Sequence, residues 1–354
     1  MNNKGKWTNI LVPVFSVILG LLLGALIMFA FGYNPIEGYQ AMVNGAFGNT
    51  FYIGETLRQA TPLIFTALGF SVAYTAGFFN IGVAGQALFG WLFSVWFALS
   101  FPEIPGIILL AISLIVGALA GALWAGIAGF LRAFFNTSEV IVTIMLNYIA
   151  LYTSNYLIRN VLSESSDTTA RIPEEASLRL AWLSELTSNS TLHAGIFLAL
   201  IMAIIVWIFM KKTTSGFEIR AVGLNPFASK YAGMSTKRNI IVSMLISGSL
   251  AGLGGAMEGM GTFQNIFVQG AMPTIGFDGM AVALLGLGNP VGILFSALLF
   301  GALKIGGNSM PLMAGVPTEV VDIVIASIIF FVGANYLIRF FIDKRAKVNK
   351  GGVK

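Results

Sequence analysis

The chain has 354 residues, of which 56% are hydrophobic and only 10% charged, with a net charge of +5 and a mean hydropathy of +0.84. Soluble domains typically carry about 25% charged residues, so this composition excludes a soluble enzyme and predicts a polytopic membrane protein. The absence of cysteine and the single histidine, His193, exclude disulfides, thiolate chemistry and multi-histidine metal sites.

Ten apolar runs are suited to crossing a bilayer, which takes about 20 helical residues, with shorter runs allowed inside a bundle. The first run exceeds the roughly 7–15 residues of a signal-peptide core, so we expect a retained helix. Merging the two runs that flank Gly288, Asn289 and Pro290 would reduce the number to nine. The predicted fold is all-α, with about ten transmembrane helices at residues 10–32, 56–75, 87–101, 105–131, 139–158, 193–210, 239–258, 275–288, 290–305 and 318–341.

The segment AYTAGFFNIGVAGQALFG, residues 73–90, places three glycines and two amides between two apolar runs. Lipid-exposed backbone must satisfy its own hydrogen bonds, so a break of this kind persists only where protein or a water-filled cavity surrounds it. Polar breaks at membrane depth typically line the path of a polar solute. The segment therefore predicts a transport protein, with Asn80 and Gln86 as candidate path residues.

The distribution of charge predicts the orientation of the chain, because basic residues concentrate in cytoplasmic loops. With the N-terminus inside, ten crossings place the loop 211–238 and the basic tail 342–354 in the cytoplasm, and the longer, net acidic loop 159–192 outside. An odd number of crossings would put either the basic N-terminus or the basic tail outside. We therefore expect both termini in the cytoplasm, and the net charge then needs no nucleic-acid partner.

The inner loop 211–238 is the longest predicted cytoplasmic connection, and it carries two short helix signals. Residues 215–222, including Glu218, favour a first helix, and the turn GLNP at 223–226 places Pro226 at the first position of a second. An apolar face on the second helix suits a surface that lies against something else. The apolar face would rest either on the lipid headgroups or in a groove on a cytoplasmic partner.

Three segments together resemble one family: GFFNIGVAGQ (77–86), GLNPFASKYAGM (223–234) and GFDGMAVALLGLGNP (276–290). They are similar to the permease family of bacterial ABC importers for ribose-type sugars, nucleosides and branched-chain amino acids. The resemblance runs from about residue 57 to 338, in the family's order. Within the family, the chain is most similar to permeases of nucleoside importers, of the guanosine or purine-nucleoside type.

The resemblance implies the organisation of a type II importer, with an inverted repeat that relates helices 2–5 to helices 7–10. Residues 1–354 would then form a single transmembrane permease domain. Its parts would be an extra N-terminal helix (10–32), a first half (56–158), an extracellular loop (159–192), a cytoplasmic coupling loop (211–238), a second half (239–341) and a basic cytoplasmic tail (342–354).

The resemblance also implies partners. The chain contains no G-x-x-x-x-G-K-[ST] phosphate loop, so ATP and magnesium would bind to a separate ATPase subunit and this chain would bind no cofactor of its own. A second permease subunit, of different sequence, and an extracellular lipoprotein that binds the substrate would complete the importer in the bacterial cell membrane. The residues implied in coupling to the ATPase are Glu218, Gly223, Asn225, Pro226, Ala228, Ala232 and Gly233.

A nucleoside is neutral and rich in hydroxyls, and its base is aromatic, so its path needs amide partners and aromatic surfaces. The candidate path residues are therefore Phe79, Asn80, Gln86, Asn147 and Tyr148, and Phe78 and Tyr152 offer further aromatic surfaces. A hydrogen bond between helices explains Asn147 equally well. Glu258 and Asp278 are expected near outer helix ends, where water and headgroups would solvate them.

Other classes of protein explain these features less well. A simple-sugar permease of the same family is the alternative nearest to a nucleoside permease. An ion-driven secondary transporter would need an ionisable coupling residue deep in a helix, and the central thirds of the predicted helices contain almost none. An intramembrane enzyme would need a catalytic constellation, and none stands in the apolar runs. His193 is interpreted as a boundary residue at the start of a helix.

Overall fold

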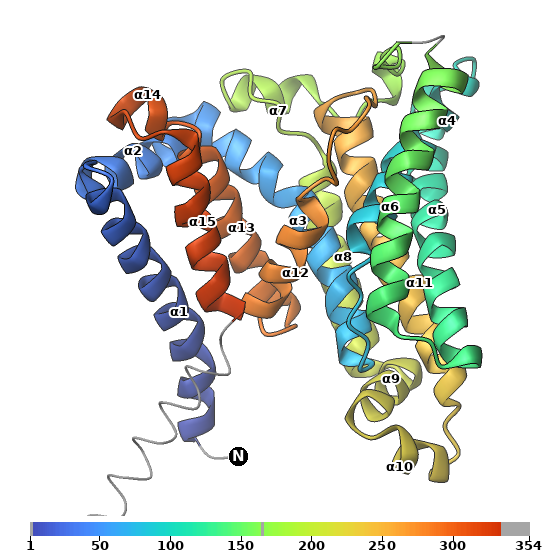
Figure 1. The fold of residues 1–354 in the computed structure, drawn as a ribbon. Helices are drawn as coiled ribbons and strands as arrows, with labels where there is room; N and C mark the ends of the chain where they lie inside the picture. Colours follow the sequence, from blue (N-terminus) through green and yellow to red (C-terminus); the bar gives the residue numbers. More distant parts are fainter. Residues whose placement is uncertain (1–2, 164–165, 334–354) are drawn as a thin grey trace, which may run out of the picture. The chain divides into compact units, whose positions relative to one another are not determined.

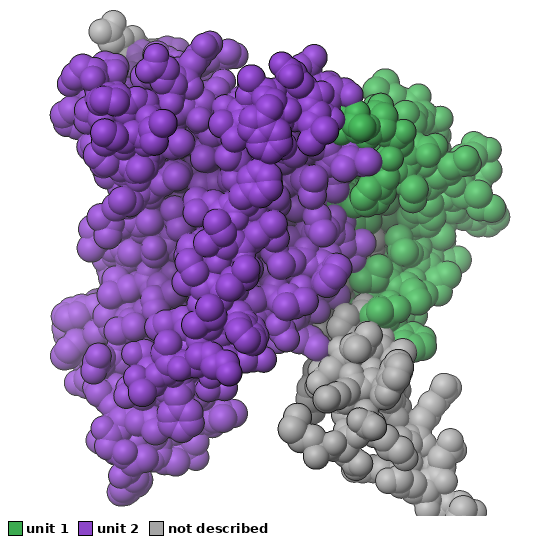
Figure 2. Space-filling view, turned by 180° about the vertical axis from the view of Figure 1, so that it is seen from behind, with its two compact units in different colours: residues 1–52, 302–354 green, residues 53–301 purple. Residues whose placement is uncertain are grey.

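A computed structural model describes residues 3–163 and 166–333 of the chain. The predicted tail 342–354, the end of the last predicted helix (334–341) and Glu164 of the outer loop lie outside the described residues. Throughout the described ranges the chain forms helices and loops without a strand, apart from an isolated bridge between Thr168 and Phe267. The chain divides into two compact units (Figure 2): Met1–Tyr52 with Ala302–Lys354, and Ile53–Gly301.

Each predicted apolar run overlaps a helix, and the turn at Gly288 does separate two helices. Among the residues that the structure describes, six helices are long and apolar enough to cross a membrane, and Val14–Ala30 and Ile275–Leu285 are shorter apolar helical stretches. The ten crossings stay a prediction. In chain order (Figure 1) the helices are α1 Asn3–Ala30, α2 Pro35–Phe47, α3 Thr50–Thr75, α4 Val83–Ser100, α5 Gly106–Phe135, α6 Glu139–Leu157, η1 Ile158–Leu162, η2 Glu174–Ala176, α7 Ala181–Leu186, α8 Gly195–Lys212, α9 Thr214–Leu224, α10 Pro226–Tyr231, α11 Thr236–Met257, η3 Glu258–Thr262, α12 Ile275–Leu285, α13 Pro290–Gly307, α14 Met310–Ala314 and α15 Thr318–Gly333.

The first unit is built from the two ends of the chain. α1 packs along α15, and α2 packs on α14. α2 was not predicted, although its start is encoded locally: the Asn34 side chain accepts a hydrogen bond from the Ile36 amide, and Pro35 takes the first helical position. Inside the unit, Gly45 lies so close to the Ser309 side chain that a Cβ at this position would collide with it.

The core of the second unit is the crossing of α5 and α11, with α4 packed against both. Two pairs of glycines at four-residue spacing, Gly117 with Gly121 on α5 and Gly248 with Gly252 on α11, lie at this crossing. A Cβ on Gly121 would collide with the carbonyl oxygen of Gly248, and one on Gly252 would collide with that of Gly117. The absence of side chains at these glycines lets the two backbones come into direct contact.

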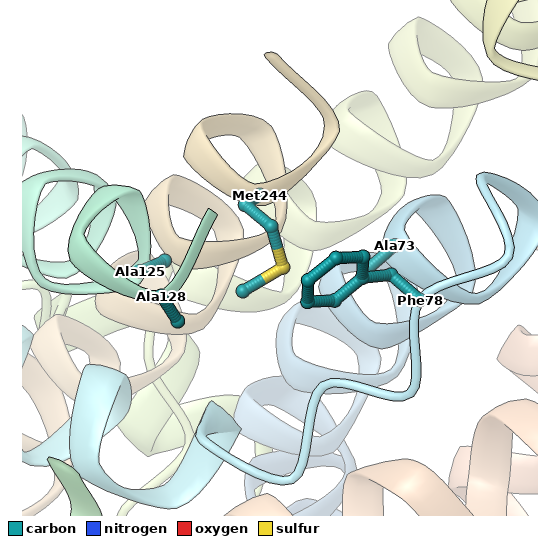
Figure 3. Close-up of a cluster of buried hydrophobic side chains, with 5 residues drawn as sticks. All are labelled: Ala73, Phe78, Ala125, Ala128 and Met244. Atoms are coloured by element: carbon teal, nitrogen blue, oxygen red, sulfur yellow. The ribbon is translucent and has the colours of Figure 1, made fainter. Parts of the chain in front are cut away.

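One cluster of buried apolar side chains lies next to the predicted helix break, between α3, α5 and α11 (Figure 3). It contains Ala73 of α3, Phe78 of the following segment, Ala125 and Ala128 of α5, and Met244 of α11. The Phe78 ring points toward the Met244 side chain and is buried. Phe78 is therefore a core residue that anchors the chain after α3, and it offers no aromatic surface to a solute.

The long outer loop is held against the chain that follows α11. The amides of Thr169, Ile172 and Leu178 donate hydrogen bonds to the carbonyl oxygens of Ile266, Gln264 and Met260, at 2.9, 2.8 and 2.9 Å. Arg179 donates from Nε to the Gly261 carbonyl oxygen at 2.9 Å and from its Nη2 to that of Thr262. Backbone hydrogen bonds and the Arg179 side chain thus fix the loop to the π-helix η3 and the residues beyond it.

Candidate functional site

The predicted break between two apolar runs is confirmed as a gap between α3 and α4. α3 ends because Gly77 adopts a positive φ of 83°. The amide of Phe78 then donates to the carbonyl oxygen of Ala73 at 2.9 Å, and that of Gly77 to Tyr74 at 3.0 Å, which satisfies the end of the helix. The chain runs without helical structure until α4 begins at Val83.

Asn80 and Gln86 meet as a buried pair inside this break. The Asn80 amide nitrogen donates to Gln86 Oε1 at 3.0 Å, and Gln86 Nε2 donates to Asn80 Oδ1 at 3.1 Å. Asn80 also donates to the hydroxyl of Ser247 on α11 at 2.9 Å and accepts from the backbone amide of Gly82 at 3.0 Å. Both side chains are almost fully buried, at 0% and 1% exposure. Their hydrogen bonds therefore join the break, the first turn of α4, and α11.

Asn147 of α6 binds the same segment from the other side. Its Oδ1 accepts from the amide of Gly85 at 2.9 Å, and its amide nitrogen donates to the carbonyl oxygen of Ile81 at 2.9 Å. A Cβ on Gly85 would lie 2.8 Å from Asn147 Oδ1, so a glycine is needed for this approach. The helix-to-helix hydrogen bond that we considered for Asn147 is present, between α6 and the start of α4.

The motif that begins at Gly276 reaches the same place, although it lies about 190 residues further along the sequence. Gly276 opens α12 and packs directly on the backbone of Ala84 at the start of α4, where a Cβ would collide. The Thr66 hydroxyl of α3 donates to the carbonyl oxygen of Ile275 at 3.3 Å. Two of the three motifs that carry the family resemblance therefore meet at one helix start.

The predicted aromatic path residues do not take part in these hydrogen bonds, although each is next in sequence to one of the amides. The Phe79 side chain is partly exposed and packs edge-on against Phe70, with ring centroids 5.3 Å apart. Tyr148 lies on α6 beside Asn147, and half of its side chain is exposed. The structure brings Asn80, Gln86 and Asn147 together, and it leaves Phe79 and Tyr148 accessible in this subunit. Contact of any of the five with a solute stays a prediction.

Two acidic residues lie at helix ends, as expected, but the expectation that water and headgroups surround them is wrong. Glu258 and Asp278 are buried, and water and headgroups do not surround them. Glu258 begins η3, which the outer loop covers. Asp278 lies in the first turn of α12, where the positive end of the helix dipole favours an acid, and this turn packs on α3 and α4. In both cases the covering segment is distant in the sequence.

The inner loop forms the two short helices that its sequence predicts. Thr213 caps α9 by accepting from the Gly216 amide at 3.1 Å. Asn225 caps α10 by accepting from the Ala228 amide at 3.0 Å, and Pro226 takes the first helical position. Glu218 accepts a hydrogen bond from Asn239 at 2.9 Å, which links α9 to the start of α11. Helix propensity in 215–222 and the turn before Pro226 were sufficient to predict both helices.

α10 offers an apolar surface that nothing in the described chain covers. Tyr231 is 95% exposed, and Leu224 and Phe227 are exposed as well. Of the seven residues implied in coupling, five lie exposed on or beside α10, whereas Glu218 and Gly223 are half-buried; the five are Asn225, Pro226, Ala228, Ala232 and Gly233. The exposed apolar side chains have the size and position of a docking surface.

A contact that the sequence did not indicate joins this loop to the helix break. Gly223, near the end of α9, packs on the last residues of α3, and a Cβ on it would collide with the carbonyl oxygen of Thr75. Gly77 faces Gly223 at the same contact, with a Cβ distance of 3.4 Å to the Gly223 Cα. The inner loop thus touches the residues that lead directly into the Asn80 segment. Glycines at both positions were the sole sequence signal.

His193 begins the approach to α8, as predicted, and it is buried. Its Nδ1 accepts from the Gly195 amide at 3.2 Å. Burial lowers the pKa of His193 to about 3, with the positive charges of Arg58 and Arg179 adding to the effect, so the imidazole is neutral at physiological pH. Across residues 3–163 and 166–333, no group of three or more His, Asp or Glu side chains is arranged to hold a metal ion.

Comparison with known proteins adds a family to this geometry. Residues 52–333 match the family model described as a branched-chain amino acid transport system, permease component. The chain is 53% identical to the guanosine ABC transporter permease protein NupP of Bacillus subtilis, over 97% of this chain and 98% of that protein. It is 51% identical to the nucleoside ABC transporter permease protein NupB of Lactococcus lactis, over 97% and 95% of the two chains.

Similarity extends to a second permease of Bacillus subtilis. The guanosine ABC transporter permease protein NupQ is 30% identical to the chain, over 75% of this chain and 86% of that protein. NupP and NupQ are therefore two related permeases of one organism, both similar to this chain. No solved structure matches the chain.

Proposed function

The chain belongs to the family of branched-chain amino acid transport system permease components, and we propose that it forms the path for nucleosides as one permease subunit of an ABC importer. The observation that carries the proposal is the match to two nucleoside permeases, at 53% and 51% identity over almost the full length of each chain. The chain is a membrane-spanning transport subunit and not an enzyme. One relative is a guanosine permease and the other a nucleoside permease, which supports a nucleoside as the solute.

We place the ATPase at the inner loop. The exposed side chains of α10 and the turn at Asn225 support docking of a separate ATPase there, with ATP and magnesium bound on that subunit. Movement of α10 reaches the Asn80 segment through α9, because Gly223 touches the end of α3. The residues that take part in this step are Glu218, Gly223, Asn225, Pro226, Ala228, Ala232 and Gly233.

We assign the remaining partners from the same relatives. The pairing of NupP with NupQ in one organism supports a second permease subunit of different sequence. An extracellular lipoprotein would deliver the nucleoside, and no nucleic acid takes part. In the bacterial cell membrane both termini lie in the cytoplasm, with the loop 159–192 outside and the loop 211–238 inside.

We assign the solute path to Phe79, Asn80, Gln86, Asn147 and Tyr148. In this arrangement the three buried amides set the conformation of the break, and the two partly exposed aromatic rings face the solute. The inverted repeat of helices 2–5 and 7–10, in which the breaks at Gly82 and Gly276 would correspond, stays a prediction. Gly276 itself packs on Ala84, two residues after Gly82.

Uptake in a strain that lacks this chain tests the proposal. Radiolabelled guanosine uptake should fall to background in that strain and return when the chain is restored. Unlabelled uridine and inosine compete if the path accepts nucleosides in general, and ribose does not compete. Guanosine uptake that persists without the chain, or ribose uptake that alone depends on it, would contradict the proposal and favour a simple-sugar permease.

A further inference from the structure

The chain between η3 and α12 runs beside α6 without helical structure (Figure 1 shows it between α11 and α12). At one level, the side-chain amide of Asn155 on α6 exchanges two hydrogen bonds with the backbone of Gln269, each at 2.9 Å. At another level, Gly276 packs on Ala84 at the start of α4, to which Asn147 of α6 is hydrogen-bonded. Asn147 and Asn155 are eight residues apart, so the unwound stretch 270–275 follows α6 over about 12 Å.

This stretch lies at the depth of the hydrocarbon core. α6 and η1 together form a candidate membrane span, Glu139–Leu162, of 24 residues. Asn147 and Asn155 lie eight and seven residues from the ends of this span, which is about 10 Å or more. The hydrocarbon core is about 30 Å thick, so both levels and the stretch between them fall inside it.

Three residues of the stretch leave their backbone polar groups unpaired. Within residues 3–163 and 166–333, neither the amides of Ala271 and Met272 nor the carbonyl oxygens of these two residues and Pro273 form a hydrogen bond. Ala271 is exposed, and Met272 and Pro273 are half-buried. Unpaired backbone groups are costly in hydrocarbon, so an irregular segment at this depth faces protein or a water-filled cavity and not lipid.

Water suits this stretch better than a protein partner does. A partner chain would satisfy an extended segment by strand pairing, but Pro273 has no amide hydrogen and interrupts such a ladder. No charged residue occurs from Phe263 to Phe277 that could bind a partner instead. At Ala84 the end of the stretch touches the start of α4, directly after the break that leads from the inner loop. The stretch therefore lies where a movement of the inner loop can reach it.

The break between α3 and α4 offers a solute fewer free polar groups. The side-chain amides of Asn80, Gln86 and Asn147 already form hydrogen bonds within the protein. Of the two unwound segments, the one before α12 is therefore the one with free backbone donors and acceptors at membrane depth.

We infer that the backbone of Ala271, Met272 and Pro273 binds the ribose hydroxyls of a nucleoside inside the path, and this assignment rests on the proposed function. Each hydroxyl both donates and accepts a hydrogen bond, and the stretch offers amide donors next to carbonyl acceptors. Because these groups carry no net charge, they suit a neutral solute and bind it weakly enough to release it. They contact the sugar, so purine and pyrimidine nucleosides both fit.

Thiol labelling tests whether water reaches the stretch. Because the chain contains no cysteine, Ala271→Cys and Met272→Cys each introduce one thiol. Leu119→Cys, at an exposed leucine in the middle of α5, is the control for a lipid-facing position. A methanethiosulfonate reagent that reacts only in water is applied to membranes that hold the full complex. We expect both positions of the stretch to react and Leu119→Cys to stay unreactive. Absence of reaction at both positions would show that protein covers the stretch, and it overturns the inference.

Protection by solutes tests the chemistry of the site. Guanosine should slow the labelling of Ala271→Cys, and uridine, which has the same sugar, should protect at a similar concentration. For 2′,3′-dideoxyguanosine, which lacks both hydroxyls of the sugar ring, the concentration that gives the same protection should be about tenfold higher, as for two lost hydrogen bonds. Equal protection by guanosine and its dideoxy analogue, or protection that uridine does not share, overturns the inference.

Uptake separates this inference from the proposed function. Labelling of Ala271→Cys should stop guanosine uptake, because the added group fills the path, whereas Leu119→Cys treated in the same way should keep its uptake. Continued uptake through the fully labelled Ala271→Cys complex overturns the inference alone, as does a lack of protection while the wild-type complex imports guanosine. A wild-type complex that imports no nucleoside overturns the proposed function instead.

Discussion

Both polar atoms of the Asn80 side-chain amide, the nitrogen and the oxygen, form hydrogen bonds inside the protein. Asn80 exchanges two hydrogen bonds with Gln86, donates a third to Ser247 and accepts a fourth from the Gly82 backbone. The residue was singled out because it stands in a glycine-rich break between two apolar runs, and polar breaks of this kind typically line the path of a solute. The pairing is internal, and its main physical effect is to fix the shape of a segment that has no helical hydrogen bonds.

We predict that Asn80→Leu destabilises the break and lowers uptake. The change leaves the Gln86 amide and the Ser247 hydroxyl buried without partners, at a cost of about 1–3 kcal/mol for each unsatisfied group. Thermal unfolding of the purified chain and uptake in cells measure the two effects. Phe79→Leu, at the adjacent exposed position, is the control for stability. An unchanged unfolding temperature for Asn80→Leu would show that the amide pair contributes little.

At the scale of elements, the contact between α9 and α3 connects two regions that were predicted separately. Gly223 and Gly77 let the inner loop lie directly on the last turn of α3. The next residues lead into the segment that Asn80, Gln86 and Asn147 hold in place. A displacement of α10 by a bound partner therefore has a short physical route to the helix break.

We predict that Gly223→Val uncouples ATP hydrolysis from uptake. A Cβ at this position collides with the Thr75 carbonyl oxygen, so α9 must move away from α3. In the reconstituted complex, basal ATP hydrolysis should remain while uptake per ATP hydrolysed falls. Gly270→Ala is the matched control, because a Cβ there meets no atom within 4 Å. Coupled uptake at the wild-type ratio would refute a role for this contact.

We also predict that the exposed apolar side chains of α10 hold the ATPase. Tyr231→Ala together with Phe227→Ala should weaken the affinity of the chain for the ATPase about 30-fold, which corresponds to the loss of an interface hot spot worth about 2 kcal/mol. Less ATPase should therefore be recovered when the tagged chain is purified. The stability of the chain itself should not change, because neither side chain packs on it. Leu312→Ala, at an equally exposed leucine, should leave recovery of the ATPase intact. Full recovery with the double variant would move the docking surface elsewhere.

For the whole molecule, orientation in the membrane decides whether these assignments are compatible. The inner loop must lie in the cytoplasm if an ATPase binds it, and the loop 159–192 must then lie outside. We predict that Trp182→Cys on α7 reacts with an impermeant maleimide in intact cells, whereas Ala232→Cys, just after α10, reacts only after permeabilisation. Both positions are exposed. The opposite pattern would rule out both the ATPase site and the predicted topology.

Features that depend on a few adjacent residues were predictable. The break at Gly77, the caps at Thr213 and Asn225, and the start of α10 at Pro226 follow from local hydrogen bonding and backbone sterics. Features that depend on packing against segments distant in the sequence were not predictable. Glu258 and Asp278 were expected near outer helix ends with water and headgroups around them, and segments from elsewhere in the chain bury them.

By itself the sequence determined that this protein spans a membrane, where its helices break, and that it belongs with permeases of ABC importers, because hydropathy and motif order are properties of the linear chain. The tertiary structure alone decided that Asn80, Gln86 and Asn147 bind the break rather than stand open, that Gly223 touches the end of α3, and that the chain before α12 runs unwound beside α6. Each of these depends on which side chain faces which neighbour, and packing between distant segments sets that arrangement.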